Sequence, residues 1–518
     1  MQQESRVKKS LLNARVNLIF YFLTLVLSFF SRKIFLDSLG ADFVGLTATL
    51  QNLLGFLNLA ELGVSTAIGY VLYKPLFDHD ENKINEIISV FGYIYRWIGF
   101  IILGAGLILG IFLPLIFSDT IFNFGLIYFA YFSFLVSSLI GYFINYRQTL
   151  LGADQRNYVV TTYFQSVTII KMLIQMALAY YTGSYYIWLA IELTFGIIYS
   201  FILNWKINKV YPWLKSEIKL GKQLFKQYPE VIKYTKQLFV HKLGGFVQFQ
   251  ISPILVFSFV SLKIVAYYNN YTIIVDKITI LFNNMLGGIF ASVGNLIAEG
   301  NRNKIISVYW ELVAVRFFLA GTMAFCLYQL VEPFIAFWIG KEYILDHTVL
   351  ILILINMFIT LTRASEPFLY GYGIYSDILS PIIEIIIYVS IAIIAGHQYG
   401  LPGIISAGIL SQIIIGYIWK PYFLYKKGFK ETCFNYIKIW PAYLLCTIAA
   451  IISSNWVINS INIEYTKITI GGLLKIGIIS LIIFAVIDVT LLFIFTKGMK
   501  TFVKRMKKYI YDKLQERS

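Results

Sequence analysis

Charged residues are scarce in this 518-residue chain. They make up only 14% of it, against about 25% in a soluble globular protein, whereas hydrophobic residues reach 58% and the mean hydropathy is +0.72. The three cysteines, Cys326, Cys433 and Cys446, lie far apart and cannot all pair. This composition excludes a disulfide scaffold and a disordered chain, and it argues against a water-soluble enzyme.

Motifs for catalysis and metal binding are also missing. The sequence has no G-x-x-x-x-G-K-[ST] phosphate loop, and its four histidines are isolated from one another. We therefore expect no enzyme activity, no catalytic residue, no metal site and no bound cofactor. Whether an ion such as H⁺ or Na⁺ is coupled to the function is left open.

Long apolar runs recur from one end of the chain to the other. A bilayer core needs about 20 apolar residues per helix, and about fourteen segments of the chain meet this requirement. The predicted spans lie at about 12–39, 43–73, 87–116, 124–150, 158–182, 186–205, 239–260, 268–299, 305–331, 346–370, 378–396, 402–423, 439–457 and 471–496. The sequence predicts an all-α polytopic membrane protein.

The distribution of basic residues predicts the orientation. With a cytoplasmic N-terminus, the predicted outer loops hold only Lys263, Lys341 and Lys467, and the inner segments hold most of the other basic residues. This positive-inside bias places both termini in the cytoplasm. Because topology accounts for most of the formal charge of +16, we do not expect a nucleic-acid partner.

Two segments concentrate the basic residues, and the first of them divides the predicted spans into two groups. Residues 206–242 carry nine lysines among apolar residues, and the tail 497–518 carries eight basic residues. Both patterns are typical of amphipathic helices on an anionic membrane surface. The predicted domains are an N-terminal lobe, a basic linker, a C-terminal lobe, two extra spans and a basic tail, at residues 1–205, 206–238, 239–424, 425–496 and 497–518.

The two predicted six-helix lobes echo one another in sequence. Asn82-Lys83-Ile84 follows the second span and Asn303-Lys304-Ile305 follows the eighth, at an offset of 221 residues. RQTLLGADQRNY (147–158) and EPFLYGYGIYSD (366–377) follow the fourth and tenth spans at an offset of 219. The lobes are therefore predicted to be pseudo-symmetric about an axis along the membrane normal, with a substrate site between them that alternates its access.

Ionisable residues inside the spans are the candidate site residues. A charge facing lipid costs at least about 2.5 kcal/mol at the bilayer centre, so such residues usually face protein or water. Gln165, Thr168, Lys171 and Gln175 share one helix face, which favours either a wet cavity or hydrogen bonds between helices. The candidates are Arg32, Glu61, Lys171, Lys277, Arg363 and Glu366.

Each candidate also has a structural alternative. Arg32 could form an ion pair with Asp37 or Glu61, and the glycines around Glu61 equally suggest close helix packing. Arg363 precedes Glu366 by three residues, so the two could pair along one helix face. Lys420, near the end of a span, can extend to the membrane interface.

SRKIFLDSLGADFVGLTATLQNLLGFLNLAELGVSTAIGYVLYKPL (31–76) resembles the opening of bacterial Wzx-type oligosaccharide flippases, and LLGADQRNY (150–158) matches a second stretch. These flippases belong to the multidrug/oligosaccharidyl-lipid/polysaccharide exporter superfamily. The resemblance implies a protein of the bacterial plasma membrane that moves an undecaprenyl-pyrophosphate-linked oligosaccharide to the outer leaflet. It implies membrane lipids and the polysaccharide polymerase machinery as partners. Arg32, Lys171, Lys277 and Arg363 would then bind the pyrophosphate.

Two other functions remain open. An ion-coupled multidrug or metabolite antiporter of the same fold would favour buried acids for an organic cation. A membrane-bound glycosyltransferase or polymerase would need a large loop outside the membrane, and the longest predicted outer loops have only about 15 residues.

Overall fold

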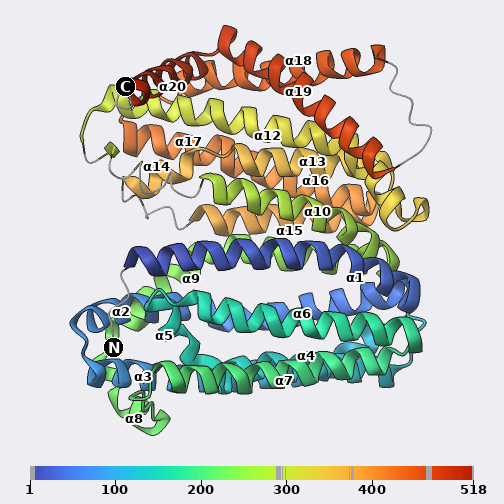
Figure 1. Cartoon of the computed structure of the whole chain (residues 1–518), viewed down its shortest axis with the longest axis vertical. Coiled ribbons are helices and arrows are strands. Elements are labelled where there is room, and N and C mark those ends of the chain that lie inside the picture. Colours follow the sequence, from blue (N-terminus) through green and yellow to red (C-terminus); the bar gives the residue numbers. More distant parts are fainter. Residues whose placement is uncertain are drawn as a thin grey trace. The chain divides into compact units, whose positions relative to one another are not determined.

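The fold is described from a computed structural model. It covers residues 6–286, 293, 296–297, 299–372, 374, 379–461 and 469–515. The described residues form helices and turns, with no strand among them (Figure 1). The all-α prediction is confirmed.

The helices form two compact units, which divide between Phe257 and Ser258. The helices of the first unit are α1 (Arg6–Leu57), η1 (Asn58–Glu61), α2 (Val64–Asp78), α3 (Glu81–Ile116), α4 (Phe124–Phe143), η2 (Asn145–Arg147), α5 (Gln148–Ala153), α6 (Asn157–Thr182), α7 (Tyr185–Val210), α8 (Ile218–Leu224), η3 (Phe225–Gln227) and most of α9 (Pro229–Phe259). Within this unit α1 packs on α6, α6 on α7, α7 on α4, and α4 on α3.

The second unit follows with α10 (Leu262–Leu286), α12 (Arg302–Trp338), η4 (Lys341–Tyr343), α13 (His347–Thr362), α14 (Ser365–Gly371), α15 (Leu379–Tyr399), α16 (Leu401–Gln412), η5 (Ile413–Trp419), α17 (Lys420–Phe423), η6 (Leu424–Phe429), α18 (Phe434–Ser460), α19 (Ile470–Phe495) and α20 (Lys497–Gln515). Here α13 packs between α12 and α16, α15 packs on α16, and α18 and α19 pack on α12.

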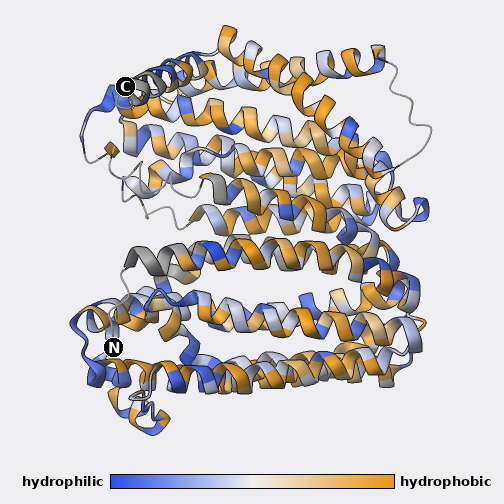
Figure 2. Ribbon diagram, viewed as in Figure 1, coloured by the Kyte–Doolittle hydropathy of each residue, from blue (hydrophilic) through white to orange (hydrophobic). Residues whose placement is uncertain are grey.

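Ten of the described helices are long and apolar enough to cross a membrane. Figure 2 shows hydrophobic residues along their lengths and hydrophilic residues gathered near many of the helix ends and turns. The chain is therefore a multi-pass membrane protein. The count of fourteen spans stays a prediction, because α6, α9 and α10 are not among these ten and α1 runs through two predicted spans.

Two breaks in the first unit coincide with glycines. Gly40, at the predicted boundary between the first two spans, has φ 83° and kinks α1. Gly63, with φ 90°, is the N-cap of α2 just after η1. Positive φ is readily adopted only by glycine, so these residues allow the chain to change direction inside apolar sequence.

The sequence echo corresponds to repeated local structure. The side chain of Asp80 accepts a hydrogen bond from the Lys83 backbone N–H at the start of α3, and Asn301 accepts one from Lys304 at the start of α12. The two helices begin 221 residues apart and have nearly equal lengths. The second echo follows α4 and α13, which are each succeeded by a short helix, α5 or α14.

The basic linker packs against α3. The Lys215 backbone N–H donates to Asn85 Oδ1 at 2.7 Å, and that of Glu217 donates to Ser89 Oγ at 2.9 Å. These bonds attach the start of the linker to the first unit. The predicted domain boundaries at 205 and 238 stay predictions, since compactness alone divides the chain inside α9.

Candidate functional site

A break in the tenth predicted span positions the clearest group of buried charges. Helix α13 ends at Thr362, and Arg363, its C-cap, has ψ 108°, outside the helical region. Pro367 lies four residues further on. A proline has no N–H to donate to the carbonyl four residues before it, and its ring clashes with that carbonyl. The chain therefore starts a new helix, α14, with Pro367 in its first turn.

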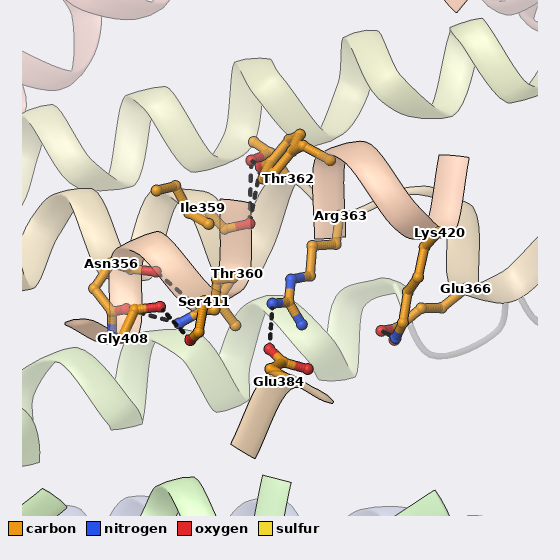
Figure 3. Close-up of polar contacts among 12 residues, drawn as sticks. Asn356, Ile359, Thr360, Thr362, Arg363, Glu366, Glu384, Gly408, Ser411 and Lys420 are labelled. Carbon is orange, nitrogen blue, oxygen red and sulfur yellow. Dashed lines mark hydrogen bonds and ion pairs between the residues drawn. The ribbon is translucent and has the colours of Figure 1, made fainter. Parts of the chain in front are cut away.

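Arg363 forms an ion pair with Glu384 of α15. An Nη nitrogen of Arg363 donates to Glu384 Oε1 at 2.8 Å, and the side chains are only 15% and 14% exposed (Figure 3). Gly416 of η5 leaves room for the guanidinium, because a Cβ on this glycine would lie 2.6 Å from Arg363 Nε. The close approach of η5 to Arg363 thus requires glycine at position 416.

Glu366 forms a second ion pair in the same region, with Lys420 at the start of α17 (Figure 3). The alternative in which Arg363 pairs with Glu366 is not what the structure shows, because the helix break gives the two residues different partners. Lys420, which could have extended to the membrane interface, is instead part of this ion pair. Its side chain is only 16% exposed and is held by Glu366.

Arg316 of α12 adds a third cation. It is 8% exposed and donates from Nη1 to the Leu361 carbonyl at 2.9 Å. A cation at the carboxyl end of a helix is stabilised by the carbonyls there, so Arg316 supports the end of α13. Glu366 lies within electrostatic range of both arginines.

We call this group the charged cluster; its members are Arg316, Arg363, Glu366, Glu384 and Lys420. Three cations and two carboxylates leave one net positive charge. Both carboxylates, of which Glu384 is 14% and Glu366 is 32% exposed, accept a hydrogen bond from a cation. These bonds offset part of the cost of removing the charges from water.

Uncharged polar residues continue from the charged cluster along α13. Thr360 donates to Gln412 Oε1 at 2.8 Å, and Gln412 donates to Asn356 Oδ1 at 2.7 Å. Near Arg363, Thr362 and Tyr417 share a hydrogen bond, and Tyr417 also donates to the Ile359 carbonyl at 2.9 Å. These bonds join α13 to α16 and η5 and fix the positions of the cluster residues (Figure 3).

In the first unit, Glu61 lies at the break between η1 and α2. Its carboxylate accepts hydrogen bonds from Tyr95 of α3 and from Tyr142 of α4, the latter at 3.0 Å. Tyr142 also lies 2.9 Å from Asn58 Oδ1. Glu61 therefore joins three helices through neutral donors.

Lys171 and Gln175, from the polar face predicted on α6, meet Glu192 of α7. Lys171 Nζ donates to Glu192 Oε1 at 2.6 Å, and Gln175 Nε2 donates to Glu192 Oε2 at 3.0 Å. The Lys171 side chain is 20% exposed. Hydrogen bonding between helices, one of the two interpretations of this face, accounts for these contacts. That Lys171 faces a cavity stays a prediction.

Arg32 and Lys277, the other candidates, are half-buried on α1 and α10. Of the two acids considered as partners of Arg32, Asp37 pairs with Lys33 at 3.4 Å and Glu61 accepts the tyrosine hydroxyls described above. The structure thus brings together Arg363 and Glu366 from the candidate set, and it places Glu61 and Lys171 in different hydrogen-bond networks.

The candidate set omitted three residues of the charged cluster. Arg316 and Glu384 carried the relevant signal, since both are ionisable residues inside predicted spans. Lys420 did not, because a lysine close to a span end is ordinarily solvated. Among the described residues, no three His, Cys, Asp or Glu side chains converge as a metal site would require.

Comparison with known proteins identifies the fold. No protein-family model matches the chain, and no curated protein matches its sequence. Among solved structures, the lipid II flippase MurJ in an inward closed conformation is similar with a TM-score of 0.61 and 14% identity. The alignment covers 92% of this chain and 98% of MurJ. An inward-facing multidrug resistance MATE transporter is similar with a TM-score of 0.55 and 13% identity, over 80% and 99% of the two chains.

The helical architecture and these similarities define the class of fold. The chain has the fold of the multidrug/oligosaccharidyl-lipid/polysaccharide transporters, and the similarity to MurJ extends over nearly its whole length. At 13–14% identity the similarity concerns the fold and carries no substrate.

Proposed function

We propose that the protein is a flippase that moves an undecaprenyl-pyrophosphate-linked oligosaccharide from the cytoplasmic to the outer leaflet of a bacterial plasma membrane. The observation that carries the proposal is the charged cluster, whose three cations are each no more than 16% exposed and gather near a helix break. The fold, shared with a lipid II flippase over 92% of the chain, is compatible with a lipid-linked cargo. The expected wider role is cell-surface polysaccharide assembly, with polymerase machinery acting after the flippase.

The chemistry of the cluster suits a pyrophosphate. Arginine offers parallel N–H donors that match the oxygens of a phosphate, and lysine adds a compact charge. Glu384 and Glu366 compete with such a ligand for Arg363 and Lys420. When a pyrophosphate binds, Arg363 and Lys420 would exchange their carboxylate partners for phosphate oxygens. Their positive charges would then be neutralised both with and without cargo.

The other parts of the cargo need different surroundings while it crosses the membrane. The polyprenyl chain is apolar and stays in the bilayer, whereas the sugars and pyrophosphate need a polar path. Alternating access between two pseudo-symmetric lobes supplies that path to each side in turn. The distribution of basic residues predicts that both termini are cytoplasmic, and H⁺ or Na⁺ is a suitable coupling ion.

A second candidate function is an ion-coupled multidrug or metabolite antiporter. The fold similarity to a MATE transporter supports it, and so does Glu61, a half-buried carboxylate held by neutral hydroxyl groups. An organic cation would bind such a carboxylate more favourably than the charged cluster.

A deletion and complementation experiment separates the two candidates. Cells that lack the gene should lose surface glycan and accumulate lipid-linked oligosaccharide that an impermeant glycan label cannot reach from outside. Arg363→Ala should fail to restore export, and Arg363→Lys should restore part of it, because lysine keeps the charge without the forked geometry.

The matched control is Lys33→Ala, which removes an exposed cation from another membrane helix. It should restore export fully, and membrane abundance is measured for every variant. If deletion leaves surface glycan intact and sensitises cells to cationic drugs, the antiporter is correct. If Arg363→Ala is present at normal abundance and exports normally, the charged cluster does not bind the cargo.

A further inference from the structure

Helix α20 carries a continuous face of lysines directly after a membrane helix. It starts two residues after α19 ends, so it lies where the chain leaves the last predicted span. At 3.6 residues per turn, its exposed lysines fall within an arc of about 100°. We call this the lysine stripe; it consists of Lys497, Lys500, Lys504, Lys507 and Lys508.

The opposite face of α20 is docked on α12 (Figure 1). Gly498 is buried so tightly that a Cβ there would lie 2.1 Å from the Trp310 carbonyl oxygen. Met499 is 2% exposed, and Phe502 and Val503 pack against the same core cluster as Met499. The apolar face of the first turns of α20, from Gly498 to Val503, therefore packs against protein, and the lysine stripe is left for another partner.

The one arginine of α20 lies on the docked side of the helix. Arg505 forms a 2.8 Å ion pair with Glu311, whose side chain on α12 is only 4% exposed. A buried carboxylate is costly without a cation. The position of α20 on α12 thus decides whether Glu311 is compensated.

Residues next to Glu311 connect α20 with the charged cluster. Tyr309, two positions earlier on α12, lies 3.3 Å from the Ser365 hydroxyl through its own hydroxyl. It also contacts Phe368 edge to face. Ser365 and Phe368 belong to α14, the short helix that carries Glu366.

We propose that the lysine stripe binds anionic phospholipid head groups of the cytoplasmic leaflet, and that this binding holds α20 on α12 as a clamp. Charge complementarity carries the choice of partner, because five exposed lysines meet an anionic surface at the end of a membrane helix. Each lysine near such a surface contributes about a fivefold gain in affinity. The clamp adds to the proposed function because Tyr309 of α12 contacts α14, the helix that carries Glu366 of the charged cluster. Binding of lipid by the lysine stripe does not depend on the identity of the cargo.

Hydrogen exchange on the full-length protein tests the clamp. The protein is placed in nanodiscs of phosphatidylcholine alone or of phosphatidylcholine with phosphatidylglycerol, and exchange is followed in residues 498–508 and 309–311. Phosphatidylglycerol should slow exchange in both segments by at least about fivefold. High salt should remove the difference, since it screens exposed charges.

Two variants assign the effect to residues. The fourfold variant K500Q/K504Q/K507Q/K508Q should exchange like the wild type in phosphatidylcholine and should not respond to phosphatidylglycerol. Arg505→Gln should speed exchange in 309–311 in both lipids. An unchanged melting temperature for the fourfold variant, and a single cooperative unfolding transition for Arg505→Gln, show that neither variant unfolds the second unit.

Three results would overturn the proposal. The first is equal exchange of the wild type in both lipids, and the second is a lipid response that survives the fourfold variant. The third is slower exchange that needs an added acidic protein instead of an anionic lipid. No cargo is present in this experiment, so its failure leaves the flippase proposal intact, and a failed export assay leaves the clamp intact.

Discussion

Breaking the ion pair between Arg363 and Glu384 from one side should destabilise the protein far more than removing both charges together. Both side chains are about 15% exposed, so either charge left alone stays largely desolvated. Removal of one partner of a buried pair costs about 3–5 kcal/mol, and this partial exposure favours the lower end. Arg363→Met and Glu384→Leu should therefore each cost about 3 kcal/mol.

The double variant Arg363→Met/Glu384→Leu should lose much less stability than the sum of the two single losses. An apolar pair of similar volume is often neutral relative to a buried ion pair, so the combined change should cost less than about 1 kcal/mol. Simple addition would give about 6 kcal/mol, and the difference measures the coupling between the two residues. Unfolding in mixed detergent and SDS micelles gives the free energies.

An exposed pair supplies the control for this cycle. Lys33 and Asp37 lie 3.4 Å apart with side chains about half exposed, so Lys33→Gln and Asp37→Asn should each change stability by less than about 1 kcal/mol. If the losses for Arg363→Met and Glu384→Leu add within about 0.5 kcal/mol, the two charges are not coupled. The description of the cluster as a compensated buried pair would then be wrong.

Three further changes test other parts of the structure. Gly416→Ala places a Cβ 2.6 Å from Arg363 Nε and should reduce export toward the Arg363→Ala level. The control, Gly104→Ala, has no atom within 4 Å of its new Cβ and should export normally in the same assay. Asp488→Leu should raise the free energy of unfolding by at least about 1 kcal/mol, because the carboxylate is fully buried with no hydrogen-bond partner among the described residues. A loss of stability in this variant would indicate a bound cation. Tyr95→Phe removes a hydroxyl donor from a half-buried carboxylate and should cost about 1–3 kcal/mol in the SDS titration; an unchanged midpoint would show that this bond is not needed.

The membrane-spanning architecture could be predicted from sequence because it depends on composition within continuous segments. A helix satisfies its own backbone hydrogen bonds, so an apolar run of sufficient length is enough to predict it. The internal repeat was visible for a similar local reason. Asp80 and Asn301 cap helices through a residue three positions later, and such a contact leaves its mark in neighbouring sequence.

The partners of the buried charges were decided by tertiary structure. Arg363 and Glu366 are three residues apart, a spacing at which they could pair. The break before Pro367 instead directs Arg363 to Glu384 and Glu366 to Lys420. These contacts join residues 21 and 54 positions apart. The sequence determined which charges lie within apolar runs, because that depends only on the neighbouring residues. Only the packing of separate helices decided which charges compensate one another, because that depends on where a helix breaks and what lies across from it.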